Sequence, residues 1–370
     1  MKILQISDLA PPHIGGVEKV VWKYASLLSK EGNDVSILTS SLPNVKNKER
    51  IENVTFNRVP KIALALPSLY TNDFEIIHTH SYISFFDLSI EKKIRGSVII
   101  KHVHSVYGSD LENFTGWSVS RIFSKIERYL LSADCTAYIV PSEFTKKNLR
   151  NFGINKEIHV VPHGTDYEKF PEKEKAREFL NLPKEKKIIG FIGRMSSGKG
   201  PQDLAKIWGE IKKKLPDSIL IFIGPDPNVK TSGIVGISEQ VKKIIAESGY
   251  KEDVIFTGMV EEEKMPYYIA SLDLFASPSI NEGFGLTILN SMAAGVPVVA
   301  YNNSAIPEVV GDAGLLVPTK DLESLKNAII NILSDEKLYR EMSTMAMLRA
   351  SQFTWNKAVN SLYNIYSNYL

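Results

Sequence analysis

The chain has 370 residues, which is enough for two domains of ordinary size rather than a single core. Its 44 lysines and arginines nearly balance its 42 aspartates and glutamates, which argues against a general binder of nucleic acid or other polyanions. The single cysteine, Cys135, excludes an internal disulfide and a cysteine-based metal cluster. The N-terminal apolar run is too short for a signal peptide, and no apolar stretch approaches the ~20 residues of a membrane span, so we expect a cytosolic protein.

The first half of the chain alternates short β-branched runs with longer amphipathic ones. Apolar residues at helical spacing over 17–28 lie between strand candidates at 2–7 and 34–39. This order predicts a right-handed βαβ unit and a parallel sheet. Further strand candidates follow at 75–80, 97–103, 137–142 and 158–163.

A charged, proline-containing stretch at 165–187 predicts a connection between two domains, with a short helix in it. The alternation then restarts at 187–193 and continues to 314–318, which predicts a second doubly wound sheet. The last segment, 353–370, has the pattern of an amphipathic helix whose apolar face must dock on the rest of the protein.

The first glycine-rich turn, in LAPPHIGGVEKV, follows the first strand candidate and opens a helix. Gly15 and Gly16 would let the backbone approach a ligand, and the helix N-terminus would present free N–H groups to an anion. A tight turn that simply needs glycine explains the pair equally well. The fingerprint G-x-G-x-x-G is absent, which disfavours a nicotinamide- or flavin-dependent dehydrogenase.

A second glycine-rich loop, GRMSSGKG, leaves the first strand of the second predicted domain. Arg194 and Lys199 lie in this loop, at the end of the strand where open α/β sheets bind ligands. They suit a diphosphate, because a guanidinium binds bidentately and an ammonium acts as a point charge. The alternative is a pair of solvated surface cations, and the G-K-[ST] of a Walker loop is missing.

The most specific segment is SPSINEGFGLTILNSMAAGVPVVAY. Glu282 precedes a predicted helix whose first amides would face an anion. A carboxylate beside a phosphate is electrostatically unfavourable unless it has another role, such as accepting hydrogen bonds from sugar hydroxyls. The alternative is that Glu282 is merely an acidic residue at the N-terminus of a helix. The candidate amides are those of Gly283, Phe284, Gly285 and Leu286.

This segment resembles the E-x7-E motif of the retaining group 1 (family 4) glycosyltransferases. An ordered series of motifs extends the resemblance over nearly the whole chain: HIGGVEKVV, IIHTHS, KHVHSVYGSD, YIVPSEFTKKNL, VVPHGTD, GRMSSGKG, IPEVVGDAGLLVP and FTW. The family implies an α/β GT-B fold of two Rossmann-like, doubly wound domains that face each other across a cleft, with the C-terminal helix crossing back to the first domain. Residues 1–166 with 353–370 would then bind the acceptor, and residues 167–352 the nucleotide-sugar donor.

Carried over by position, the family implies roles for single residues. Arg194 and Lys199 would grip the donor diphosphate and Gly16 would approach it. Glu282 and the amides after it would hold the transferred sugar and its phosphate. His104, in KHVHSVYG, matches the active-site histidine that contacts the donor sugar; a buried strand-end histidine is the alternative.

One position departs from the family. The second glutamate of the motif, which would accept hydrogen bonds from the nucleotide ribose, is replaced by Asn290. One amide oxygen serves two hydroxyl donors less well than a carboxylate does, so we expect altered nucleotide handling or lost activity.

The resemblance implies a retaining transferase of glycan biosynthesis, which moves a hexose-type sugar from a UDP-, GDP- or ADP-sugar to a glycan, lipid-linked or small-molecule acceptor. No D-x-D pair occurs, so we expect no cofactor and no metal, with Arg194, Lys199 and helix ends neutralising the phosphates. His78 and His80 share a strand face, but the sequence shows no third ligand, and we favour a structural role for both.

Three other functions stay open: a GT-B sugar phosphorylase, synthase or epimerase, a non-catalytic nucleotide-sugar-binding protein (because of Asn290), and a dehydrogenase. Segments 58–70 and 117–131 mix basic and apolar residues. They could contact the inner face of a membrane as a peripheral protein does, although ordinary packing explains them equally well.

Overall fold

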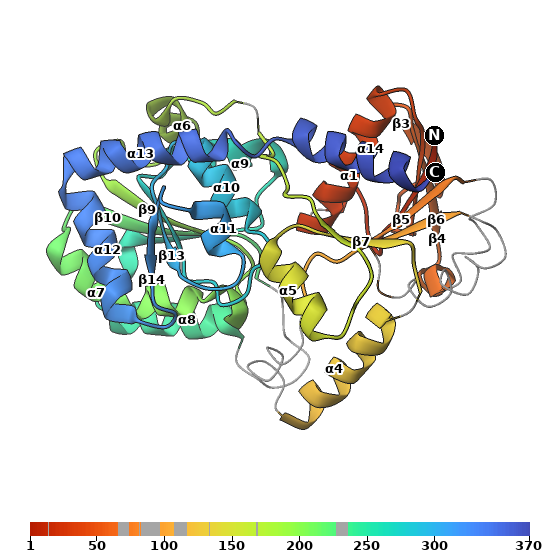
Figure 1. Cartoon of the computed structure of the whole chain (residues 1–370). Coiled ribbons are helices and arrows are strands. Elements are labelled where there is room, and N and C mark those ends of the chain that lie inside the picture. Colours follow the sequence, from red (N-terminus) through yellow and green to blue (C-terminus); the bar gives the residue numbers. More distant parts are fainter. Residues whose placement is uncertain are drawn as a thin grey trace. The chain divides into compact units, whose positions relative to one another are not determined.

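The computed structural model divides into two compact units, Met1–Gly164 with Thr354–Leu370, and Thr165–Phe353 (Figure 1). The family resemblance placed the domain boundaries at 166 and 353. The residues that the structure describes are 1–13, 15–65, 74–80, 82, 97–106, 117–132, 134–167, 169–226 and 236–370.

The first unit is built on an eight-stranded sheet. Its strands are β1 (Lys2–Ile6), β2 (Asp34–Ser40), β3 (Lys48–Ile51), β4 (Val54–Val59), β5 (Ile76–Thr79), β6 (Val98–His102), β7 (Ala137–Val140) and β8 (Ile158–Val160). Their order is β3-β4-β2-β1-β5-β6-β7-β8, and every pair is parallel except β3 with β4. The strand order reverses between β1 and β5, which is where doubly wound sheets bind ligands.

The hairpin of β3 and β4 is an addition that the sequence analysis missed. Glu52 and Asn53, at its turn, both have positive φ, as a two-residue hairpin turn requires. β3 is a largely exposed, charged edge strand, and β4 alternates half-buried Thr55 and Asn57 with buried residues, so neither has the continuous apolar run by which the other strands are recognised.

The helices of the first unit are α1 (Gly16–Lys30), α4 (Trp117–Ser132), α5 (Glu143–Asn151) and α14 (Trp355–Tyr369), with a 3₁₀ turn at Lys61–Ala65. The final helix, α14, packs against α1, as its apolar face required: the rings of Trp355 and Tyr24 meet edge to face at 5.5 Å. A side chain at Gly164 would place its Cβ 2.1 Å from the Trp355 backbone nitrogen, so only glycine lets the two segments approach this closely.

The second unit has a six-stranded, fully parallel sheet. Its strands are β9 (Lys187–Ile192), β10 (Ser218–Ile223), β11 (Val254–Gly258), β12 (Leu274–Ser277), β13 (Val298–Tyr301) and β14 (Leu315–Val317). The order β11-β10-β9-β12-β13-β14 reverses between β9 and β12. β9 and β14 lie where the sequence predicts the first and last strands of this domain, and the other four strands lie between them in the chain.

Helices cover both faces of this sheet (Figure 1). They are α6 (Lys173–Phe179), α7 (Pro201–Lys214), α8 (Ile237–Glu247), α9 (Met265–Ser271), α10 (Leu286–Ala293), α11 (Ile306–Val310), α12 (Leu322–Ser334) and α13 (Glu336–Ala350). Alternate residues of β10 enter two separate cores, Ile219 and Ile221 on one face and Leu220 and Phe222 on the other. In the described part of the chain, every helix is too short or too polar to span a bilayer.

Candidate active site

Two loops of the second unit meet at the point where its strand order reverses. One follows β9 and contains residues 193–200; the other follows β12 and contains residues 278–285. The backbone N–H of Ile280 donates to the carbonyl of Gly198 at 3.0 Å, and the Ser279 hydroxyl donates to the same oxygen at 3.1 Å. Gly200 has φ 68°, and a Cβ there would lie 2.1 Å from the Pro278 carbonyl oxygen. The close approach of the loops therefore depends on glycine at position 200.

An ion pair joins the two loops. Lys199 Nζ lies 2.5 Å from Glu282 Oε1, with 28% of the lysine side chain and 11% of the glutamate side chain exposed. The Glu282 N–H donates to Ser304 Oγ at 3.0 Å, and the Glu282 carbonyl accepts from the Ala305 N–H at 3.2 Å. The carboxylate is thus held on a braced backbone, while the ammonium stays reachable from solvent.

The helix beyond Glu282 starts later than the sequence analysis placed it. α10 begins at Leu286, and its N-cap is Gly285, whose φ of 101° favours glycine. Gly283 and Phe284 precede the helix, and the Phe284 ring anchors the loop in the core by an edge-to-face contact with Phe353 at 5.9 Å. The first intrahelical donor is the N–H of Leu289, so the helix leaves the amides from Gly285 to Ile288 without an intrahelical acceptor, and these are the amides that an anion would meet.

Arg194 lies on the same loop as Lys199, but its side chain is exposed. Its carbonyl accepts from the Ser196 N–H at 2.8 Å, and the next N–H, of Met195, donates to Pro225 at 3.1 Å. The loop backbone is therefore fixed at this point. Among the described residues, the Arg194 guanidinium forms no ion pair. The structure brings Lys199 and Glu282 together and leaves the Arg194 side chain in solvent.

Asn290 is buried on α10, where its side chain binds a residue that the sequence analysis did not single out. Asn290 Oδ1 accepts from the Asp166 N–H at 2.8 Å, and Asn290 Nδ2 donates to Asp166 Oδ2 at 2.8 Å. The amide therefore already uses one acceptor site and one donor within the protein.

Gly15 and Gly16 lie at the start of α1 in the first unit, with Gly15 as the N-cap in an extended conformation. A Cβ at Gly16 would meet no atom within 4 Å, and one at Gly15 would meet only the flexible end of Glu18. No backbone neighbour in the described chain requires glycine here, so an approaching ligand remains the functional explanation for Gly16.

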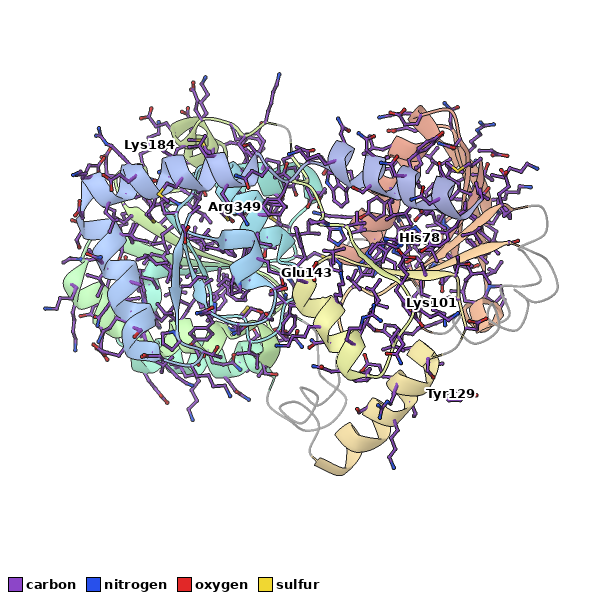
Figure 2. The ribbon with its side chains drawn as sticks, viewed as in Figure 1. His78, Lys101, Tyr129, Glu143, Lys184 and Arg349 are labelled. Atoms are coloured by element: carbon purple, nitrogen blue, oxygen red, sulfur yellow. The ribbon has the colours of Figure 1, made fainter. Side chains whose placement is uncertain are left out.

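The first unit also contains five histidines that lie together, which we call the histidine cluster: His78, His80, His102, His104 and His163. Figure 2 shows His78 within this unit, with Lys101 on the neighbouring strand. The cluster lies at the carboxyl ends of β5 and β6 and in the segment after β8. His104, the predicted sugar contact, is its least buried member.

Burial keeps the histidine cluster neutral. It lowers the pKa of His78 and that of His104 to about 3, with the nearby His104 as a smaller cause for His78. Burial first, and then the neighbouring histidines, also hold the pKa values of His80, His102 and His163 well below the usual range. Each ring therefore has one N–H and one lone pair at neutral pH.

Two groups of three within this cluster have ligand atoms within 4.8 Å of one another: His78, His80 and His102, and His102, His104 and His163. The fold therefore places His102 beside His78 and His80, where the sequence showed no third candidate ligand. However, the rings of His102 and His104 stack at 4.2 Å with an interplanar angle of only 10°. Since a lone pair lies in its ring plane, two stacked rings cannot both point at one ion at the ~2.0–2.1 Å of a metal–nitrogen bond. In the second group the geometry therefore favours hydrogen bonds over metal binding, and in the first group His78 Nε2 already lies at hydrogen-bond distance from His102 Nδ1, 3.2 Å away.

The chain matches known families along both units. Residues 14–169 match the family described as Glycosyltransferase Family 4, and residues 172–349 match the family described as Glycosyl transferases group 1. The chain belongs to the group 1 glycosyltransferases and is an enzyme of that class, with the GT-B fold.

Individual relatives cover almost the whole chain. The chain is 25% identical to D-inositol 3-phosphate glycosyltransferase of Corynebacterium aurimucosum, over 96% of this chain and 91% of that protein. Its fold is similar to that of sucrose-phosphate synthase from Thermosynechococcus elongatus, with a TM-score of 0.85, 23% identity and coverage of 99% and 98%. It is also similar to Anabaena HepE in complex with UDP-glucose, with a TM-score of 0.81, 19% identity and full coverage of both chains (100% and 100%).

Proposed function

We propose that the protein transfers a hexose-type sugar from a nucleoside-diphosphate sugar to an acceptor hydroxyl, with retention of anomeric configuration and without a metal ion. The observation that carries this proposal is the ion pair of Lys199 with Glu282, beside the first turn of α10. An ammonium and free amides bind phosphate, and a carboxylate accepts hydrogen bonds from sugar hydroxyls.

In the proposed reaction, Lys199 changes partner when the donor binds. The diphosphate takes the ammonium and the amides from Gly285 to Ile288, and the Glu282 carboxylate then accepts hydrogen bonds from the sugar hydroxyls. Negative charge grows on the leaving diphosphate as the glycosidic bond breaks, so the cation and the helix end stabilise the transition state more than the bound donor. The departing phosphate itself takes the proton of the acceptor hydroxyl, which therefore attacks the same face of the sugar.

Arg194 contributes to this proposal only when the donor is bound. Its side chain is solvated in the structure, on a loop whose backbone is fixed. A long, flexible guanidinium can swing onto a phosphate without moving that backbone. We therefore assign Arg194 to binding of the diphosphate once the donor is bound. His104 is assigned separately, as a contact to the donor sugar.

The relatives support a nucleotide-sugar donor and a hydroxyl acceptor. Anabaena HepE is described in complex with UDP-glucose, and the corynebacterial relative is named for inositol 3-phosphate.

The test is to incubate the purified protein with UDP-, GDP- and ADP-sugars in EDTA, with and without candidate acceptors. We expect slow donor hydrolysis without acceptor, faster nucleotide release with the right one, and a product whose anomeric proton signal shows the donor's configuration. Inversion, or strict dependence on a divalent ion, would contradict the proposal.

Peripheral contact with a membrane is a separate part of the proposal, made for α4. Ile126 and Tyr129 are 51% and 60% exposed there, next to the exposed Lys125 and Arg128. Apolar side chains beside cations suit an anionic lipid surface. Flotation with anionic liposomes should carry the wild type and lose Ile126→Asp; equal flotation of both proteins would reject a role for α4.

A further inference from the structure

A line of hydrogen bonds runs through the histidine cluster from β1 to His104. Gln5, on β1, places its Oε1 2.9 Å from His80 Nε2. His80 Nδ1 in turn lies 2.9 Å from His104 Nε2. Gln5 and His80 are buried, whereas His104 is partly exposed, so the line leads from the interior of the first unit to a residue that a ligand can reach.

The donor and the acceptor of each hydrogen bond in this line are set by the side-chain carbonyl oxygen of Gln5, at its buried end. A carbonyl oxygen only accepts, so His80 Nε2 must carry the hydrogen. His80 is neutral because burial holds its pKa well below the usual range, so His80 Nδ1 carries the lone pair. His104 Nε2 must then donate to it. His104 is neutral as well, and its Nδ1 is left as an acceptor.

We propose that Gln5 and His80 are positioning residues that fix the tautomer of His104, so that His104 Nδ1 accepts a hydrogen bond from a hydroxyl of the donor sugar. This inference rests on the proposed function, in which His104 contacts that sugar. A neutral imidazole in solution exchanges between two tautomers, and only one of them accepts through Nδ1. If the tautomer of His104 is fixed before the donor binds, every His104 ring can already accept through Nδ1, and no tautomer exchange has to accompany binding.

A second line of hydrogen bonds in the histidine cluster begins at a hydroxyl instead of a carbonyl oxygen. Tyr366, on α14, lies with its hydroxyl 2.5 Å from His78 Nδ1, and His78 Nε2 lies 3.2 Å from His102 Nδ1. A hydroxyl both donates and accepts, so it does not select a direction. This line ends at His102 Nε2, which is buried without a hydrogen-bond partner in the described structure. It therefore provides a matched control in the same stack of rings.

The test uses the full-length protein with ¹⁵N-labelled histidine. The chain has only seven histidines, and long-range proton–nitrogen spectra distinguish a protonated ring nitrogen from a bare one. The His104 signals are identified by their loss in His104→Gln. In the wild type we expect His80 and His104 each to be protonated at Nε2 and bare at Nδ1.

Gln5→Met keeps the volume of the side chain but removes its strong acceptor. In this variant we expect the His104 signals to become those of a tautomer mixture. We also expect kcat/KM for sugar transfer to fall about tenfold, as for the loss of one hydrogen bond, while the affinity for the nucleoside diphosphate without sugar is unchanged. Tyr366→Phe, which breaks the other line, should leave the His104 tautomer as in the wild type.

Two results would overturn the inference: protonation of His104 at Nδ1 in the wild type, or an unchanged His104 tautomer in Gln5→Met. If the wild type transfers sugar from no donor, the proposed function fails, while the spectra still decide whether Gln5 and His80 set the tautomer.

Discussion

Asn290 binds Asp166 by two hydrogen bonds of 2.8 Å, although the two residues lie 124 positions apart in the chain. One bond fixes the Asp166 backbone and the other its carboxylate, so α10 is tied to the segment that leads into α6. The family resemblance assigned position 290 to the nucleotide ribose. In this structure the Asn290 side chain has a structural partner.

Asn290→Glu tests this pairing. Two carboxylates would face each other where an amide now donates, and we expect the variant to lose about 2 kcal/mol of stability, seen as a lower melting temperature. Adding Asp166→Asn restores a donor opposite the new carboxylate and should recover much of the loss. Equal melting temperatures for the wild type and Asn290→Glu would show that the pair contributes nothing.

Lys199→Met removes the cation that pairs with Glu282 and keeps the length of the side chain. We expect kcat/KM for transfer to fall about a hundredfold or more, because a preorganised charge at the leaving group is lost. The control is Lys206→Met on α7, where the lysine is half exposed and pairs with Asp203 at 3.3 Å. That variant should stay within about twofold of the wild type, as an exposed pair contributes little.

Gly200→Ala tests the contact between the two loops of the site. Its Cβ would lie 2.1 Å from the Pro278 carbonyl oxygen, so the loop that carries Lys199 must move away from the loop that carries Glu282. We expect a larger loss of activity than in Gly249→Ala, whose φ is also positive but whose Cβ would meet nothing within 4 Å. Both variants pay a backbone strain of about 1 kcal/mol. Equal activities would mean that the loop contact does not position Lys199.

The histidine cluster predicts that the first unit loses stability in acid. The pKa values of His78 and His104 are about 3 in the folded chain, below their ordinary value. Below pH 6.5 the unfolded state therefore binds protons that the folded state does not. The stability from the neutral rings is fully present well above pH 6.5 and is lost progressively as the pH falls towards 3, because over this range the rings are charged in the unfolded state only.

Hydrogen-exchange protection factors at pH 7 and pH 5 check this prediction within one molecule. All seven histidines lie in residues 1–164, so the second unit has none. The protection factors of the amides in β5 and β6 should decrease when the pH is lowered from 7 to 5, whereas those in β9 and β10 should change much less. A parallel loss in both units would mean that another group controls the acid transition.

Much of the fold could be predicted because buried parallel strands leave short apolar runs, such as SILIFI at β10. β3 could not be recognised, because an edge strand of charged residues leaves no such run. Lys199 and Glu282 were each recognised in a motif. They meet because their loops leave two neighbouring parallel strands, β9 and β12, at the same edge of the sheet, where the strand order reverses.

Other parts of the site carry no local signal. The contact of Asn290 with Asp166 depends on how α10 packs against a distant segment. The sequence shows that His78 and His80 share a strand face. Their contact with His102 depends on the register of β5 against β6, in which His78 lies opposite Ile100, and this register cannot be read from the sequence. The orientation of the Gln5 side chain, on which the His104 tautomer depends, exists only in the folded unit.

The most direct test of the central claim is calorimetric titration of UDP, GDP and ADP into the wild type and into Lys199→Met, both in EDTA. If Lys199 and the first turn of α10 hold the donor diphosphate without a metal, at least one of the three nucleotides binds the wild type in EDTA and binds the variant at least about tenfold more weakly. Equal affinity of both proteins for that nucleotide would contradict the account.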